Sequence, residues 1–143
     1  MQEWALWALA SAVFAALTAI FAKVGLEGVD SNFATFIRTL VIAAALVLFL
    51  TYAKKWQPLG ELGARNWLFL TLSGLATGAS WLAYFKALQM GSASQVAPID
   101  KLSVVLVVVF AVVFLGERPS TREWIGIALI ASGVFTLVFA KAS

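Results

Sequence analysis

The sequence predicts an all-α membrane protein, a bundle of five transmembrane helices forming one domain over residues 1–143. Of its residues, 62% are hydrophobic and 12% are charged, which is typical of membrane proteins and not of soluble domains. Five apolar segments are each long enough to cross about 30 Å of hydrocarbon at about 1.5 Å per residue. The predicted spans are residues 4–22, 32–52, 66–88, 93–115 and 121–140.

The first two spans are separated by a short polar turn. The first carries no charged residue and ends at Lys23, and its small residues recur every four positions, which allows close helix contacts on two sides. Asp30 or Ser31 is a natural N-cap for the second span. Arg38 lies roughly two turns inside that second helix.

The third span contains small and aromatic residues at helical spacing. Gly74 and Gly78 form a GxxxG pattern, which favours close helix packing in lipid. Lys86 is predicted in the last turn, where a cation suits the helix dipole. Trp81 lies past the middle of the span with Tyr84 one turn on. It either packs between helices or lines a substrate pathway, where its face can hold an apolar or cationic group.

The fourth span can begin in two ways. If Pro98 is the first helical residue, Asp100 is an acid in the first turn, favoured by the dipole. If Ser92 is the N-cap, Gln95 completes a Ser-x-x-Gln capping box and Pro98 kinks the helix from inside. The second alternative is favoured because its capping is complete and membrane helices tolerate proline. Asp100 then lies about 12 Å along the helix, at 1.5 Å per residue.

A second capping box opens the fifth span. Ser120 and Glu123 follow Pro119 at the required spacing. Glu117 and Arg118 precede that proline, and Glu117 is expected to be a solvated residue at a helix end.

Five spans place the two termini on opposite sides of the membrane. The cations on the N-terminal side are Lys54, Lys55, Arg65, Arg118 and Arg122, and those on the other side are Lys23, Lys86 and Lys141. The positive-inside rule therefore weakly favours a cytoplasmic N-terminus. Such a small bias also suggests that the chain inserts in both orientations. The net charge of +3 thus describes topology, and no nucleic-acid partner is expected.

Several ionisable residues are predicted in one layer, on the side opposite the N-terminus. Arg38, Asp100 and Lys101 enter their helices from that side to similar depth. Asp100 is too short to extend to the interface, so it must face protein or water. Its expected partner is Arg38 or Lys86, because adjacent helical residues point about 100° apart and Lys101 should not face it. Asp100 is either half of a structural ion pair or a titratable site whose protonation alternates with substrate binding.

The absence of Cys and His excludes disulfides, thiolate nucleophiles and imidazole bases. With one deep carboxylate there is no evident pair of nucleophile and base, so the protein is not expected to be an enzyme, and no cofactor or metal is expected. The first apolar segment follows Glu3 without a basic region and is interpreted as a retained span and not as a signal peptide.

The chain resembles the EamA-like domain of the drug/metabolite transporter superfamily, in particular its small five-helix bacterial and archaeal members. The resemblance is carried by Arg38, Lys86-Ala87-Leu88, the run from Ala93 to Ser103, Gly116-Glu117-Arg118-Pro119-Ser120, Trp124-Ile125-Gly126 and Gly133. Larger relatives carry two such units, inverted relative to each other, around a central pathway, so this chain resembles one inverted repeat of a ten-helix transporter. The first helix has no carboxylate, unlike that of small multidrug exporters.

The resemblance implies a half-size secondary transporter in a bacterial or archaeal cytoplasmic membrane, acting as an antiparallel homodimer. We expect proton-coupled export of small metabolites or amphipathic cations. Asp100 is the candidate for proton coupling, and its charge partners are Arg38, Lys86 and Lys101. The candidates for substrate contact are Trp81, Tyr84, Gln95 and Ser103, with Pro98 as the kink. The alternatives are a lipid-carrier flippase and a non-transporting membrane subunit.

Overall fold

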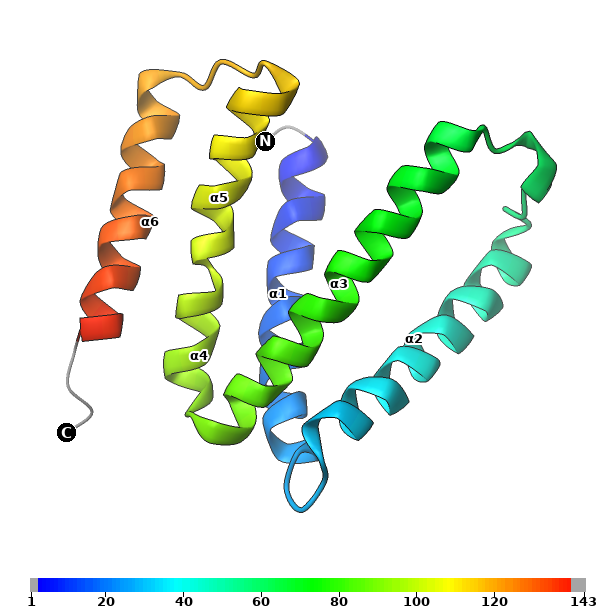
Figure 1. The fold of residues 1–143 in the computed structure, drawn as a ribbon, viewed down its shortest axis with the longest axis horizontal. Helices are drawn as coiled ribbons and strands as arrows, with labels where there is room; N and C mark the ends of the chain where they lie inside the picture. The colour runs from blue at the N-terminus through cyan, green and yellow to red at the C-terminus, as the bar shows by residue number, and fades with distance from the viewer. Residues whose placement is uncertain (1–2, 140–143) are drawn as a thin grey trace. The chain divides into compact units, whose positions relative to one another are not determined.

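The computed structural model describes residues 3–139, and every regular element in that range is a helix. The helices are α1 (Glu3–Gly25), α2 (Ser31–Ala53), α3 (Ala64–Met90), α4 (Ala93–Asp100), α5 (Leu102–Phe110) and α6 (Thr121–Phe139), with a 3-10 turn at Leu59–Glu61 and a π-helical turn at Ala111–Leu115 (Figure 1). Five stretches are long and apolar enough to cross a membrane, the fourth being Ala93–Leu115. The predicted all-α membrane fold is confirmed. Ala140, the predicted end of the fifth span, and Lys141 lie outside the described residues.

Close contacts divide the chain into two compact units, with the boundary inside α1. One unit takes α1 as far as Ala19 together with α4, α5 and α6. The other runs from Ile20 to Met90 and contains the end of α1, α2 and α3. We call them the α4–α6 unit and the α2–α3 unit. The single domain predicted over residues 1–143 stays a prediction.

In the α2–α3 unit, Asp30 begins the first helix of the hairpin. Its carboxylate accepts hydrogen bonds from the N–H groups of Asn32 at 2.9 Å and Phe33 at 3.1 Å. These are two of the donors that an α-helix leaves without an internal partner at its N-terminus. The helix ends at Lys54, whose left-handed backbone (φ 51°) directs its N–H to the carbonyls of Leu50 and Thr51. Of the two predicted N-caps, Asp30 is the residue that caps α2 in the structure.

The core of the α2–α3 unit lies at one end of this hairpin. Ser31 and Thr35 of α2 and Phe85 and Leu88 of α3 are buried, and their spacing places each pair on one face of its helix. Leu26, in the turn before α2, is buried as well. Along most of the remaining length of α2 and α3 the side chains are exposed, so within this unit the hairpin is closely packed only near its turn with α1.

Two long-range hydrogen bonds join the segments at that packed end. The Lys23 ammonium donates to the Leu88 carbonyl at 2.6 Å, and the Gln89 side-chain amide donates to the Val29 carbonyl at 3.0 Å. Both acceptors are backbone carbonyls, one in the last turn of α3 and one in the loop between α1 and α2. Such carbonyls lack helical donors and need partners of this kind.

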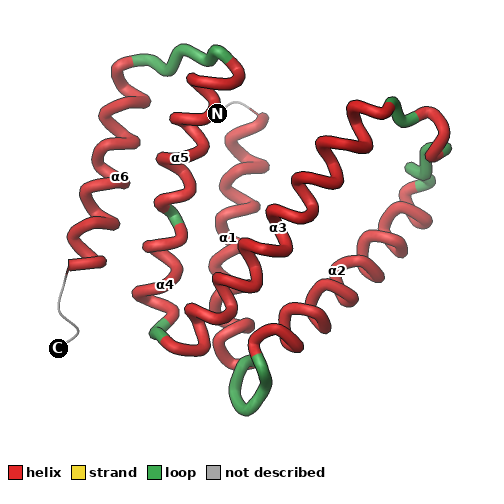
Figure 2. The backbone as a smooth tube through the Cα atoms, in the orientation of Figure 1, coloured by secondary structure: helices red, strands yellow, loops and turns green. Residues whose placement is uncertain are grey.

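In the α4–α6 unit, the fourth span is interrupted after Pro98. Because Pro98 has no N–H, the Ser94 carbonyl loses its usual helical donor. Three residues later, at Lys101 (φ −70°, ψ −5°), the chain leaves α4 and continues as α5, a break that Figure 2 shows as a short loop-coloured segment. Pro98 therefore lies inside the helix, and Ser92 is the N-cap, as favoured from the sequence.

The predicted Ser92–Gln95 capping box is wrong in detail. The Ser92 hydroxyl donates to the Gln95 side-chain oxygen at 2.9 Å and lies 3.2 Å from the Ser94 hydroxyl. It makes no capping bond to a backbone N–H. The Ser92 carbonyl instead accepts from the N–H groups of Gln95 and Val96. The Ser92 side chain therefore bonds to other side chains and does not cap the helix.

The second capping box, at the start of α6, is confirmed. The backbone N–H and the hydroxyl of Ser120 both donate to the Glu123 carboxylate, the hydroxyl at 2.8 Å. In return the Glu123 N–H donates to the Ser120 hydroxyl at 3.4 Å. Upstream of this capping box, Gly116 ends the π-helical turn in a left-handed conformation (φ 68°) that glycine adopts without strain.

The Asp30 cap yields a prediction about stability. Replacing Asp30 by Ala removes the acceptor of two N–H groups and should lower the free energy of unfolding by about 1 kcal/mol. Asp30→Asn keeps a capping oxygen and should cost much less. Equilibrium unfolding in mixed SDS and detergent micelles, followed by circular dichroism, measures both. An Asn variant as unstable as the Ala variant would show that charge, and not capping, is what matters at this position.

Candidate functional site

An arginine lies against aromatic side chains in the α2–α3 unit. The Arg38 guanidinium carbon is 4.1 Å from the centroid of the Trp81 ring and 5.3 Å from that of Phe85. Tyr84 is close enough to interact electrostatically with Arg38, and its ring centroid is 6.5 Å from that of Phe85. We call Arg38, Trp81, Tyr84 and Phe85 the Arg38 cluster.

Helix geometry explains why these residues meet. Arg38 lies seven residues from the start of α2 and Trp81 nine residues from the end of α3, so both are about 11–14 Å from the packed end of the hairpin. Each also follows the buried face of its helix, because Thr35 and Phe85 lie one turn closer to that end. The hairpin therefore brings a cation and an aromatic face to the same depth.

Sequence reasoning singled out both residues but did not pair them. Trp81 was expected either to pack between helices or to line a pathway, and Arg38 was expected beside Asp100. The structure places Trp81 between α2 and α3, and the cation on its face is Arg38 of the same chain. A signal was present in the sequence, because both positions are about equally far from the turn that joins the two helices.

Lys23 and Lys86, two lysines of the same unit, differ in their surroundings. Lys23 is half-buried and donates a hydrogen bond to the Leu88 carbonyl near the end of α3, where a cation also suits the helix dipole. Lys86 is exposed, and the prediction that it lies in the last turn is wrong, because α3 continues to Met90. Its role as a charge partner of Asp100 stays a prediction.

The ionisable pair of the fourth span lies at the helix break. Asp100 is the last residue of α4, and its carboxylate is 3.4 Å from the Lys101 ammonium. The side chains are 37% and 53% exposed, respectively. The expectation that Lys101 would not face Asp100 is wrong, because it assumed a continuous helix and the chain leaves the helix at Lys101. Arg38 and Lys86 belong to the other unit, so their pairing with Asp100 stays a prediction.

The remaining candidates flank this pair. Gln95 lies in the first turn of α4 and is exposed, with its side-chain oxygen bonded to the Ser92 hydroxyl. Ser103 is exposed in the first turn of α5, three residues after Asp100. Both stay predicted substrate contacts. Among the described residues, no group of three or more Cys, Asp or Glu side chains is placed to hold a metal ion.

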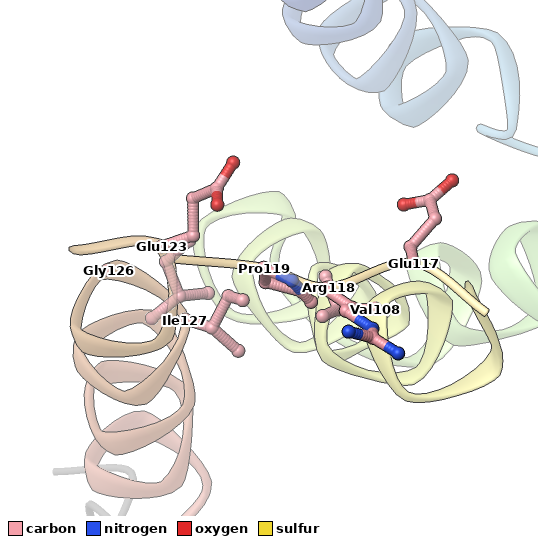
Figure 3. A pocket seen from close by; sticks show the side chains of 8 residues that line it. Val108, Glu117, Arg118, Pro119, Glu123, Gly126 and Ile127 are labelled. Carbon is pink, nitrogen blue, oxygen red and sulfur yellow. The ribbon is translucent and has the colours of Figure 1, made fainter. Parts of the chain in front are cut away.

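Sequence reasoning missed a pocket where α5 connects to α6. Its volume is about 580 Å³, and it is lined by Val108, Glu117, Arg118, Pro119, Glu123, Gly126, Ile127 and Ile130 (Figure 3). Glu117 is exposed, and Figure 3 shows its carboxylate pointing away from the Arg118 guanidinium. Glu123 is already engaged by Ser120. The pocket is an open hollow at helix ends, and its acidic lining partly serves the helix cap.

The five apolar helices agree with a comparison of the chain with known families. The model of the EamA-like transporter family matches residues 2–139. The chain belongs to the EamA-like transporter family. It is therefore an integral membrane protein with several spans and a transporter by family.

Two relatives differ greatly in length. An uncharacterized transporter in the cobO 3' region of Sinorhizobium sp. is 55% identical over 136 residues, which cover 95% of this chain and 96% of that protein. The uncharacterized transporter YxxF of Bacillus subtilis (strain 168) is 28% identical over 135 residues, which cover 93% of this chain but 42% of that protein. No solved structure matches the chain.

The contact between Arg38 and Trp81 can be measured with a double-mutant cycle. Arg38→Gln and Trp81→Leu each remove one partner, and we expect a coupling free energy of roughly 1 kcal/mol for a partly desolvated cation–π pair. Unfolding in mixed micelles supplies the four free energies. The pair Arg65 and Phe69, whose separation is 5.9 Å, is the matched control, and we expect a smaller coupling there. A coupling near zero at Arg38 and Trp81 would contradict the contact.

Proposed function

We propose that this protein is a half-size secondary transporter that moves small metabolites across a bacterial or archaeal cytoplasmic membrane in exchange for protons, as a homodimer. The observation that carries the proposal is the interrupted fourth span, which places Asp100 and Lys101 at a break inside a membrane helix. Interrupted helices form the substrate and ion sites of many secondary transporters.

The helix break supports proton coupling through Asp100. Ionisable residues within membrane helices are costly and commonly mark proton or substrate pathways. A neighbouring cation favours the charged form of a carboxylate, and exclusion of water favours the neutral form. The Asp100 carboxylate is part-exposed and lies 3.4 Å from the Lys101 ammonium. A movement that separates the carboxylate from Lys101 or closes the site to water would therefore favour proton uptake, and the reverse movement would favour proton release.

The relatives support a dimer. The Sinorhizobium protein is about as long as this chain, and the Bacillus protein is long enough for two units of this size. A transporter with two units in one chain is equivalent to two copies of a one-unit chain, related as inverted repeats. Gly74 and Gly78 add surface for such a partner, because a Cβ at either would meet no atom within 4 Å in the chain.

The Arg38 cluster restricts the charge of the substrate. Amphipathic cations were one expected class, since an aromatic face can bind them. The face of Trp81 is occupied by the Arg38 guanidinium, which would repel a second cation. Small metabolites without a net positive charge are therefore the better-supported substrates.

Reconstitution tests the class of function. Purified protein in liposomes, without any partner, should show proton movement that depends on added metabolites, followed with a pH-sensitive dye inside the vesicles. Activity that appears only with a second protein would support the non-transporting subunit, and movement of lipid-linked sugars alone would support the flippase.

The role of Asp100 yields the next prediction. Asp100→Asn should keep the fold but abolish proton-coupled flux, because an amide takes up no proton, whereas Asp100→Glu should retain part of the flux. Glu117→Gln is the matched control, since it makes the same chemical change at an exposed carboxylate of the same unit, and it should transport like the wild type. If Asp100→Asn transports normally with an unchanged pH dependence, Asp100 is not the coupling residue.

The dimer yields a prediction about membrane orientation. The chain has five cations on one side and three on the other outside its buried layer, and so weak a bias should permit both insertions. C-terminal fusions to one reporter active in the cytoplasm and another active outside should therefore both give signal. Two lysines added near Ala142 should shift the ratio toward a cytoplasmic C-terminus. Signal from the outside reporter alone, in an active protein expressed without partners, would contradict the antiparallel homodimer.

A further inference from the structure

The Arg38 guanidinium has no anionic partner within its own unit. Among the described residues from Ile20 to Met90, no carboxylate lies within 4.0 Å of its nitrogens, and no side chain or carbonyl accepts a hydrogen bond from it. Its described neighbours are instead the rings of Trp81 and Phe85 and the side chain of Tyr84. A cation that deep in a membrane helix is costly unless it is paired or meets water or a ligand.

The position of the rings leaves the donors of Arg38 available. A guanidinium is planar, and its five N–H groups point outward in that plane. Trp81 lies against the cation at 4.1 Å from its ring centroid, and stacking on an aromatic ring stabilises the charge without using any N–H group. Arg38 is only half-buried, so its donors can form the paired hydrogen bonds that arginine makes with carboxylates and phosphates.

The side chain does not extend toward the membrane interface. A lipid-facing arginine near a helix end usually places its charge among the headgroups. Arg38 lies closer to Trp81 (4.1 Å) than to Phe85 (5.3 Å). Trp81 is one helical turn farther from the end of α3, about 6 Å at 1.5 Å per residue. The guanidinium is thus held at the deeper of the two rings.

We propose that the Arg38 cluster binds an oxyanion of the transported solute, with Arg38 donating paired hydrogen bonds and the half-buried Tyr84 side chain contacting an apolar body. The substrate class is then a small carboxylate or phosphate ester with a flat or apolar portion. This inference rests on the transport function proposed above and adds the charge of the substrate to it. Trp81 acts as a positioning residue that holds the guanidinium in place.

Three probes of one shape and different charge test the proposal. Benzoate, benzamide and benzamidine carry charges of about −1, 0 and +1 at pH 7. Binding of each to the purified full chain in phosphatidylcholine nanodiscs is measured by equilibrium dialysis, without any gradient. We expect benzoate to bind at least tenfold more tightly than the other two, and phenyl phosphate to compete with it.

Variants test whether the Arg38 cluster causes the tighter binding of benzoate. Arg38→Gln should weaken benzoate binding at least tenfold and leave the weak binding of benzamide unchanged. Arg38→Lys keeps the charge but loses the paired geometry, so it should show an intermediate affinity and provides a second test if the Gln variant does not fold. Trp81→Ala should weaken benzoate binding much more than Trp67→Ala, because Trp67 lies in the first turn of the same helix, far along it from Trp81.

Several results would overturn the proposal. These are tightest binding by benzamidine, benzoate affinity that is equal in the wild type and Arg38→Gln, and equal effects of the two tryptophan variants. If Arg38→Gln reduces only the amount of phospholipid that co-purifies, the anion is a lipid headgroup and not a solute. The protein could also bind benzoate in a way that depends on Arg38 but show no proton-coupled flux. That result would contradict the transport proposal and still support the oxyanion site.

Discussion

The constraint on which the structure depends is that lipid offers no hydrogen-bonding partners to the backbone. A segment that crosses the membrane must therefore satisfy its N–H and C=O groups internally, and each of the five spans does so as a helix. The same constraint makes the few places where helical hydrogen bonding is interrupted important. In the fourth span Pro98 removes a donor and the helix is broken at Lys101, so polar groups become available inside an apolar segment.

Charged residues inside the spans are compensated in two different ways. In the α4–α6 unit, Asp100 has an ammonium beside it in the form of Lys101, and both belong to the helix break. In the α2–α3 unit, Arg38 lies against the ring of Trp81 and near that of Phe85. An ion pair neutralises charge, whereas a cation–π contact stabilises it without neutralising it. The two arrangements therefore differ in the net charge that each leaves inside its span.

Side chains also stabilise the turn regions, where helices end. Asp30 and Glu123 accept hydrogen bonds at the starts of α2 and α6, and Lys23 donates to a carbonyl near the end of α3. These bonds supply partners to polar groups that neither a helix nor lipid would satisfy. The ends of the helices are thereby held by local chemistry, while the apolar surfaces between them remain exposed within each unit and are available to lipid or to a second copy.

The sequence by itself determined the features whose causes are local. The five spans follow from apolar length, and the cap at Ser120 follows from a glutamate three positions later. For α2 the sequence offered both Asp30 and Ser31 as the cap, and it favoured the interior position of Pro98 without excluding the alternative. Local reasoning failed at Ser92, whose hydroxyl bonds to the Gln95 side chain and not to a backbone N–H, and at Lys101, where a regular helix had been assumed.

Only the tertiary structure decided which helix faces meet. It brought Arg38 to Trp81, the Lys23 ammonium to the Leu88 carbonyl, and residues of α5, α6 and their connection around one pocket. The physical reason is that a membrane helix is apolar on all sides, so the hydrophobic periodicity that marks the buried face of a soluble helix is weak. Without that signal, the depth of a residue can be read from the sequence, but the direction in which its side chain points cannot.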